Sequence, residues 1–258
     1  MKFTETPRRF VAIACALTTV ILVSLLAGST LVYAFGVPKW QDFRTTTTHE
    51  SSSSLAVLTE SGDIDVRLQP STDGQVHVTA EGRYRGDPPS IDFASDNSLI
   101  AHCPDLGFAR CDLTVIVQIP PDTSLTVESR AGSVEASDLS GRIRVTSYVG
   151  DVTLRRHSGD ITTRTTVGRI NVSAESADPI DAQSTVGDIR ISAESPPSSV
   201  KALTTHGDIA VHVPNNVTYM VDVRSAIGQS MSSVPEDPMS AHRIDAESAA
   251  GTVRIRPL

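Results

Sequence analysis

Residues 141–172 read GRIRVTSYVGDVTLRRHSGDITTRTTVGRINV, and in this stretch a glycine returns every nine residues. Each glycine is followed by a polar residue and then by β-branched or small residues in alternation. The same pattern continues at longer spacing to the C-terminus. A short fixed period is typical of a solenoid, in which no repeat can bury its apolar face alone. Because the alternation has a period of two, the stretch predicts a β-solenoid.

Two columns of aliphatic residues define the predicted coil. The residues two after a glycine recur at steps of 18, 18, 19 and 20, and a second column follows the last three of these steps. The first column is Val134, Val152, Ile170, Ile189 and Ile209, and the second is Ile143, Ile161, Ile180 and Val200. Two columns with one shared period predict two strands per coil of 18–20 residues, with coils about 4.8 Å apart.

Glycine is expected at the corners of the coil, where a positive φ or a close backbone approach excludes a side chain. The predicted corner glycines are Gly132, Gly141, Gly150, Gly159, Gly168, Gly187, Gly207, Gly228 and Gly251. Residues 129–258 are therefore predicted to form the solenoid, and the alternating strands of residues 55–128 to cap it. At the far end, residues 253–257 contain two arginines and a proline, which block pairing at an open sheet edge. The predicted fold class is all-β, with one transmembrane helix before it.

The transmembrane prediction rests on residues 10–38, which contain no charged side chain. About 20 apolar residues span a bilayer as a helix, whereas the apolar part of a secretory signal is only about 7–15 residues long. Residues 10–37 are therefore predicted to be an uncleaved signal anchor in the lipid bilayer. Lys2, Arg8 and Arg9 precede it, so residues 1–9 should stay in the cytoplasm and the C-terminal domain should lie outside. The polar, Ser/Thr-rich residues 38–54 are predicted to be a solvated stalk.

The net charge argues against nucleic acid as a partner, and the cysteine positions favour a disulfide over a metal site. The net charge is −8, and because the first 35 residues carry +2, the remainder is too acidic to favour nucleic acid. Cys103 and Cys111 flank a short loop, and a disulfide is allowed outside the cell. Two cysteines with His102 nearby do not match a zinc spacing, so we predict a structural disulfide.

Residues 111–136, CDLTVIVQIPPDTSLTVESRAGSVEA, carry a resemblance to a known family. A strand that ends in proline leads into a second strand and then into Gly-Asp-Val/Ile repeats. This resembles the bacterial "putative adhesin" β-strand-repeat family, a domain of unknown function, over about residues 55–258. The resemblance implies a protein tethered to or exported across a bacterial membrane, and it supplies no catalytic residues. The chain departs from the family pattern where Arg142, Arg169 and Thr252 replace repeat aspartates.

Two chemical alternatives remain open. A calcium-binding β-roll needs a cage of oxygen ligands at its corners, and the weak candidate here is Asp188 stacked over Asp208. A glycan-cleaving β-helix enzyme needs clustered carboxylates or an arginine base on one face, for which spacing suggests Asp160, Asp181 and Arg164. His206 takes the position that valines hold before other corner glycines, which favours a corner filler over a ligand.

The remaining interpretation is an interaction module. Thr165-Thr166, Ser184-Thr185 and Thr204-Thr205 are expected to lie on one edge beside the corners, where hydroxyl rows can contact glycans or water. We therefore expect a single-pass cell-membrane protein whose extracytoplasmic β-solenoid serves envelope interaction or sensing without catalysis. No cofactor is expected, the expected partner is an envelope glycan or protein, and the expected state is a monomer or weak oligomer.

Overall fold

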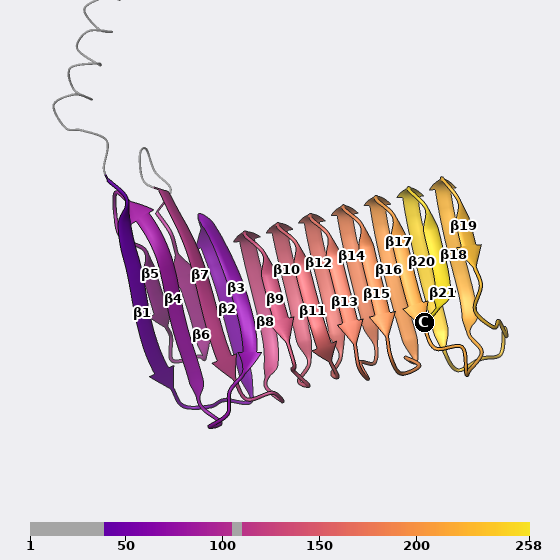
Figure 1. Cartoon of the computed structure of the whole chain (residues 1–258), viewed down its shortest axis with the longest axis horizontal. Coiled ribbons are helices and arrows are strands. Elements are labelled where there is room, and N and C mark those ends of the chain that lie inside the picture. Colours follow the sequence, from indigo (N-terminus) through magenta and orange to yellow (C-terminus); the bar gives the residue numbers. More distant parts are fainter. Residues whose placement is uncertain (1–38, 105–109) are drawn as a thin grey trace, which may run out of the picture. The chain divides into compact units, whose positions relative to one another are not determined.

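The computed structural model describes residues 39–104 and 110–258, and every regular element in this part of the chain is a β-strand (Figure 1). The chain divides into two compact units, Met1–Lys39 and Trp40–Leu258, and every described strand belongs to the second. Within the described ranges no helix is long and apolar enough to cross a membrane. The anchor predicted at residues 10–37 lies outside the described residues.

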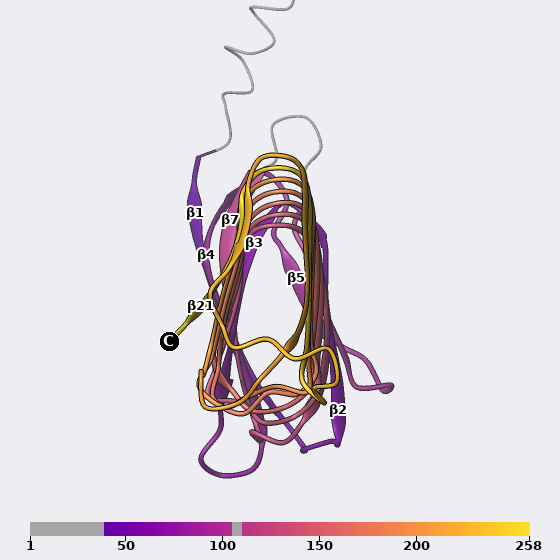
Figure 2. The same cartoon turned by 90° about the vertical axis from the view of Figure 1, so that its right-hand side faces the viewer.

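The strands form two sheets, here called sheet A and sheet B. Sheet A has eleven strands. In spatial order these are β1 (Gln41–His49), β4 (Val76–Arg85), β7 (Arg110–Ile119), β3 (Asp63–Pro70), β9 (Val134–Ser137), β11 (Val152–His157), β13 (Ile170–Ala174), β15 (Ile189–Ala193), β17 (Ile209–Val213), β21 (Val253–Pro257) and β19 (Ser230–Ser232). Viewed along the axis, the successive coils superimpose as one flattened ring with a sheet on each side (Figure 2).

Sheet B has ten strands and runs along the opposite side of the coil. In spatial order these are β18 (Met220–Ile227), β20 (Arg243–Ala250), β16 (Ser199–His206), β14 (Ile180–Val186), β12 (Ile161–Val167), β10 (Ile143–Val149), β8 (Ser124–Ala131), β2 (Ser54–Ser61), β6 (Ser98–His102) and β5 (Ser90–Phe93). Each coil contributes one strand to each sheet, so the prediction of two strands per coil is confirmed.

The aliphatic columns predicted from the sequence lie inside the coil. Val152 pairs with Ile170, Ile170 with Ile189, and Ile189 with Ile209, in parallel register along sheet A, and all four are fully buried. The column that begins at Ile143 follows the same rule along sheet B. The parallel pairing means that each coil buries its apolar residues against identical positions of the next coil, which is the core of a solenoid.

The order of the coils along the axis differs from their order in the sequence at both ends. The β2–β3 coil lies between the β6–β7 coil and the β8–β9 coil, and the β20–β21 coil lies between the β16–β17 and β18–β19 coils. The prediction that residues 253–257 form the exposed last edge is therefore wrong, because β21 pairs with β17 on one side and β19 on the other. The prediction that all of residues 55–128 form a cap also needs correction. β2, β3, β6, β7 and β8 are coil strands with at least one parallel partner, whereas β4 and β5 in that range pair in antiparallel fashion alone.

The prediction of a solvated stalk at residues 38–54 is wrong for β1, which pairs with β4 along its whole length. Thr46 bonds the hydroxyl of Thr79 at 3.4 Å across the two strands, and Phe43 packs edge-on against Tyr84. β1 is an edge strand held by backbone bonds and largely exposed, so it needs no hydrophobic alternation. Its threonine-rich sequence therefore resembled a linker.

The predicted corner glycines fall into two classes. Most lie where sheet B leads into sheet A and have positive φ: Gly132, Gly150, Gly168, Gly187, Gly207, Gly228 and Gly251. A Cβ on Gly168 would overlap the carbonyl oxygen of Gly150 in the preceding coil. Gly141 and Gly159 lie at the opposite corner, before β10 and β12, where a Cβ would also meet the backbone of the preceding coil. Close stacking of coils, rather than φ alone, thus requires glycine.

Candidate functional site

The aspartates that follow the corner glycines bond the backbone of the next coil. Asp151 Oδ1 accepts a hydrogen bond from the backbone N–H of Arg169 at 2.8 Å, and Asp188 Oδ1 accepts one from Asp208 at 3.0 Å. Asp208 accepts in turn from the N–H of Thr252 at 2.8 Å. Burial acts to raise the pKa of Asp151, but the hydrogen bonds from Arg169 outweigh it and hold the pKa below its usual value. At these three corners the aspartate of the Gly-Asp pair therefore has a structural role, because it bonds the backbone of the next coil.

The same hydrogen bonds involve the two carboxylates of the weak candidate cation site, Asp188 and Asp208. One oxygen of each carboxylate accepts a backbone N–H, and the other faces an arginine: Arg190 lies 3.3 Å from Asp188, and Arg254 lies 3.9 Å from Asp208. Among the described residues no group of three or more His, Cys, Asp or Glu side chains is placed to hold a metal. The carboxylate oxygens of this pair are engaged by protein donors.

The residues suggested for glycan cleavage are only partly brought together. Arg164 lies 3.3 Å from Asp181 on the outer face of sheet B, and Asp181 also accepts a hydrogen bond from Gln183 at 2.8 Å. Asp160 instead pairs with Arg142 at 2.8 Å. Each suggested carboxylate is thus held by an arginine of an adjacent coil, as is common for charges on a solvated strand face.

The two predicted cysteines are joined. A disulfide links Cys103, just after β6, to Cys111 in β7, with the Cα atoms 6.1 Å apart. Cys103 is fully buried and Cys111 is nearly so. The disulfide therefore ties the sheet B strand of one coil to its sheet A strand.

A buried column of hydroxyls supports the glycine corners, and the sequence interpretation missed its role. A serine or threonine lies three residues before each positive-φ corner glycine from Gly132 to Gly251. Ser184 Oγ donates to the carbonyl of Gly168 at 3.1 Å, and Thr204 Oγ1 donates to Gly187 at 3.1 Å. Thr165, Ser248 and Ser225 donate in the same way to the glycine of the adjacent coil at 3.4, 2.9 and 2.7 Å. The Ser/Thr-x-x-Gly spacing was the signal that could have predicted this column.

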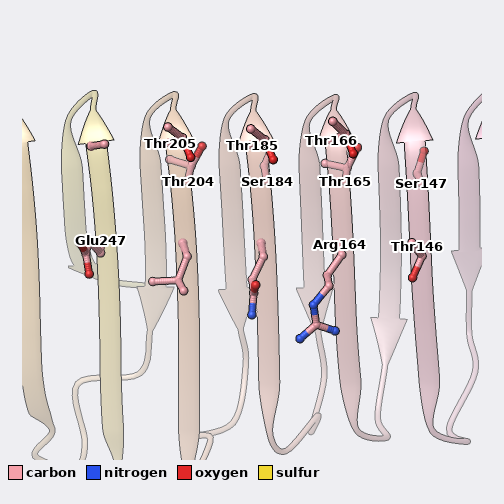
Figure 3. A pocket seen from close by; sticks show the side chains of 13 residues that line it. Thr146, Ser147, Arg164, Thr165, Thr166, Ser184, Thr185, Thr204, Thr205 and Glu247 are labelled. Atoms are coloured by element: carbon pink, nitrogen blue, oxygen red, sulfur yellow. The ribbon is translucent and has the colours of Figure 1, made fainter.

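The hydroxyl pairs expected on one edge therefore separate into two sets. Thr165, Ser184 and Thr204 point inward, whereas Thr166, Thr185 and Thr205 point outward at the ends of β12, β14 and β16 (Figure 3). Beside the outward threonines runs a second row, Val149, Val167 and Val186, whose exposed fractions are 53%, 46% and 45%. His206 continues that row in register, at the corner as predicted.

We call the two exposed rows together the Thr–Val ladder, made of Thr166, Thr185, Thr205, Val149, Val167 and Val186. Thr166, Thr185 and Thr205 line a shallow open groove of about 580 Å³ on sheet B, with Arg164 and Glu247 toward the middle of the strands (Figure 3). The parallel register places equivalent side chains on successive coils about 4.8 Å apart. The arrangement presents a row of hydroxyls and a row of aliphatic side chains side by side along the axis, and it suits an extended ligand more than a compact one.

Comparisons with known proteins give one family match and several similar solved structures. Residues 163–256 match the family described as Toastrack DUF4097. A crystal structure of a "putative adhesin" from Bacteroides fragilis aligns over 84% of this chain and 97% of its own, with a TM-score of 0.52 and 17% identity. One from Parabacteroides merdae aligns over 83% and 96%, with a TM-score of 0.40 and 14% identity. No curated protein is significantly similar.

The Bacteroides structure supports the fold alone, because the identity is low. The family match begins inside β12 and covers the coils through β21. The resemblance to a bacterial β-repeat family of unknown function is thereby confirmed, with the match to the Toastrack DUF4097 family covering residues 163–256.

Proposed function

We propose that this protein is a non-catalytic interaction module that residues 10–37 hold at the outer face of a bacterial cell membrane and that binds an envelope glycan through the Thr–Val ladder. The observation that carries the proposal is the ladder itself. Three valines are about half exposed, and they lie in register beside a row of exposed threonines on consecutive coils. Contiguous apolar surface of this kind on a solvated face marks a contact site.

The chemistry of the ladder fits a sugar chain. A pyranose ring presents C–H groups on its faces and hydroxyls on its rim, so it can pack on the valines while it exchanges hydrogen bonds with the threonines. Hydroxyl side chains both donate and accept, and they therefore match sugar hydroxyls in either orientation. Because the ladder repeats every coil, a linear glycan can make the same contact several times along the axis.

The proposed location rests on the uncharged run at residues 10–38 and the basic residues before it. The name "putative adhesin" given to the Bacteroides fragilis protein agrees with a surface role. No observation among the described residues favours the cleavage or calcium alternatives, since Asp160, Asp181 and Asp188 each have an arginine partner.

Co-sedimentation of the full-length protein in detergent with purified peptidoglycan tests the proposal. The wild type is expected to sediment with the glycan. Val167→Glu with Val186→Glu should abolish sedimentation, because two carboxylates would replace the aliphatic contact surface. A matched control, Ser173→Glu on the outer face of sheet A, should sediment like the wild type. Wild-type protein that stays in solution, or ladder and control variants that behave alike, would refute the proposed binding surface.

A further inference from the structure

The solenoid has an open end at β18, as a result of the swapped order of its last coils. β18 pairs with β20 on one side, and no strand of the described residues lies along its other side. Figure 2 faces this end of the coil, where the gold segment of the chain crosses the lower part of the opening. That segment covers only the start of the strand, where the N–H of Tyr219 donates to Pro235 and Asp237 donates back to Tyr219.

The backbone of the remaining edge is available for pairing. The N–H of Tyr219 points outward to Pro235, and the N–H of Met220 points inward to His242 beside β20. Since strand N–H groups alternate between the two sides, those of Val221, Val223 and Ser225 point outward. A buried or edge backbone group without a partner is a strong site for strand addition.

The side chains of β18 neither block the edge nor bury its core face. The strand contains no proline, no lysine and no bulge, the devices that usually protect an edge. Val221 and Val223 are only half buried, although their register partners on β20, Ile244 and Ala246, are fully buried. Ile227 ends the strand in the outward corner row of Val186 and His206 and is 75% exposed. The core-facing side chains of this last coil, Val221 and Val223, have no further coil of the described residues beside them.

The sequence of this edge is complementary to itself. When two copies pair antiparallel with Val223 opposite Val223, the outward N–H and C=O groups of that residue bond reciprocally, and Val221 lies opposite Ser225. On the other face Asp222 of each copy lies opposite Arg224 of the other. These two residues are partly exposed and already attract each other within one strand at 2.5 Å. Opposite charges placed directly across an antiparallel pair stabilise it, and like charges destabilise it.

We propose that two copies of this chain associate end to end by antiparallel pairing of β18, which joins two solenoids into one longer rod with a twofold axis through Val223. The contact covers the half-buried Val221 and Val223 of both terminal coils and satisfies the outward backbone groups between Val221 and Ser225. A symmetric contact uses the same patch twice and closes after two copies, so it produces a dimer and no fibre. Five paired residues make a small interface, and the dimer should therefore depend on protein concentration.

Charge exchange at β18 provides the test. Asp222→Arg places arginine opposite arginine twice in the homodimer, and Arg224→Asp places aspartate opposite aspartate twice. The dissociation constant of the dimer should be at least about tenfold higher for each single variant than for the wild type. Mixing the two variants restores two Arg–Asp pairs across the contact, so the mixture should associate as the wild type does. Asp181→Arg, the same change on β14 within sheet B, is the matched control and should leave association unchanged.

The readout is co-purification of two differently tagged full-length chains in detergent, together with sedimentation velocity over a range of concentrations. Thermal unfolding of each variant checks that the exposed substitutions leave the coil folded. A concentration-dependent wild-type dimer, weak single variants and a restored mixture support the proposal. A wild type that stays monomeric at every concentration, single variants that associate like the wild type, or a mixture without recovery would each overturn it.

Discussion

Replacing a single corner glycine tests the stacking of the coils with a defined steric change. Gly168 has a φ of +154°, and a Cβ there would overlap the carbonyl oxygen and carbon of Gly150 in the coil below. Neither backbone can move freely. The N–H of Gly150 donates to Val167 at 2.9 Å, and the flanking strands pair in register on both sides. Gly168→Ala must therefore strain φ or spread two coils.

The structure sets the expected magnitude. Backbone strain at a sparsely populated φ costs about 1–3 kcal/mol, and displacing a neighbouring coil adds to it, so we expect a loss of at least about 3 kcal/mol. Gly74 is the matched control, because it also has positive φ, +75°, but nothing lies within 4 Å of its Cβ position. Gly74→Ala should cost only about 1–2 kcal/mol.

Thermal unfolding of the full-length protein, followed by circular dichroism, measures the difference. At about 2–4 °C per kcal/mol for a unit of this size, Gly168→Ala should lower the Tm by about 10 °C, and Gly74→Ala by half of that or less. If the two variants lowered the Tm equally, the close contact between the corners of successive coils would not exist.

Two further variants probe buried polar groups, and reduction probes the disulfide. Ser184→Ala removes the hydroxyl that bonds the Gly168 carbonyl, and an unsatisfied buried acceptor should cost about 1–3 kcal/mol in denaturant titration; a neutral result would contradict the hydroxyl column. Burial lowers the pKa of His157 to about 4 from 6.5, so the wild type should lose up to about 3 kcal/mol as pH falls from 6.5 to 4, because only the unfolded chain takes up the proton. His157→Phe should flatten that pH dependence, and an unchanged slope would assign it to other groups. Reduction of the Cys103–Cys111 disulfide should cost about 2.5 kcal/mol by the chain-entropy estimate, which unfolding with and without reductant measures; equal stability would contradict a structural role.

The interior of the coil was predictable because its physics is local and repeated. A side chain at the position of Ile170 must contact the same position one coil away, so the steps between equivalent aliphatic residues display the coil length directly in the sequence. The hydroxyl column could be predicted in the same way, because Ser184 and Thr204 each lie three residues before a glycine. The burial of its side chains could not be predicted, because the sequence does not distinguish a buried serine from an exposed threonine next to it.

The ends of the rod were not predictable from the repeat. Coil sequences are nearly interchangeable in their apolar positions, so Ile209 accepts Val253 as its neighbour although Ser230 comes earlier in the chain. The long connection after β19 returns the chain to this inner position, and its residue Val234 is buried in the core. β1 was not predicted as a strand for a different reason: an edge strand held by backbone hydrogen bonds shows no apolar alternation in its sequence.

The outward threonines and valines were placed beside the corners correctly, but the sequence carried no measure of their exposure. Val167 follows Ile161, Thr163 and Thr165 on the inward alternation of β12, so the sequence pattern predicts a buried side chain, whereas in the structure it is 46% exposed. The sequence therefore indicated where the ladder lies, and the structure was needed to identify its apolar row.

Distances between spin labels on the outer face of sheet A test the central claim, the axial stacking of coils, most directly. Glu135, Thr153, Asn171, Arg190, Ala210, Arg254 and Met231 lie in one register row, in that spatial order. With Cys15 replaced by serine and one label at Glu135, the distance should rise by about 4.8 Å per coil, to about 24 Å at Arg254 and about 29 Å at Met231. A shorter distance to Met231 than to Arg254, or distances that do not rise evenly from Arg190 to Ala210 to Arg254, would contradict the account.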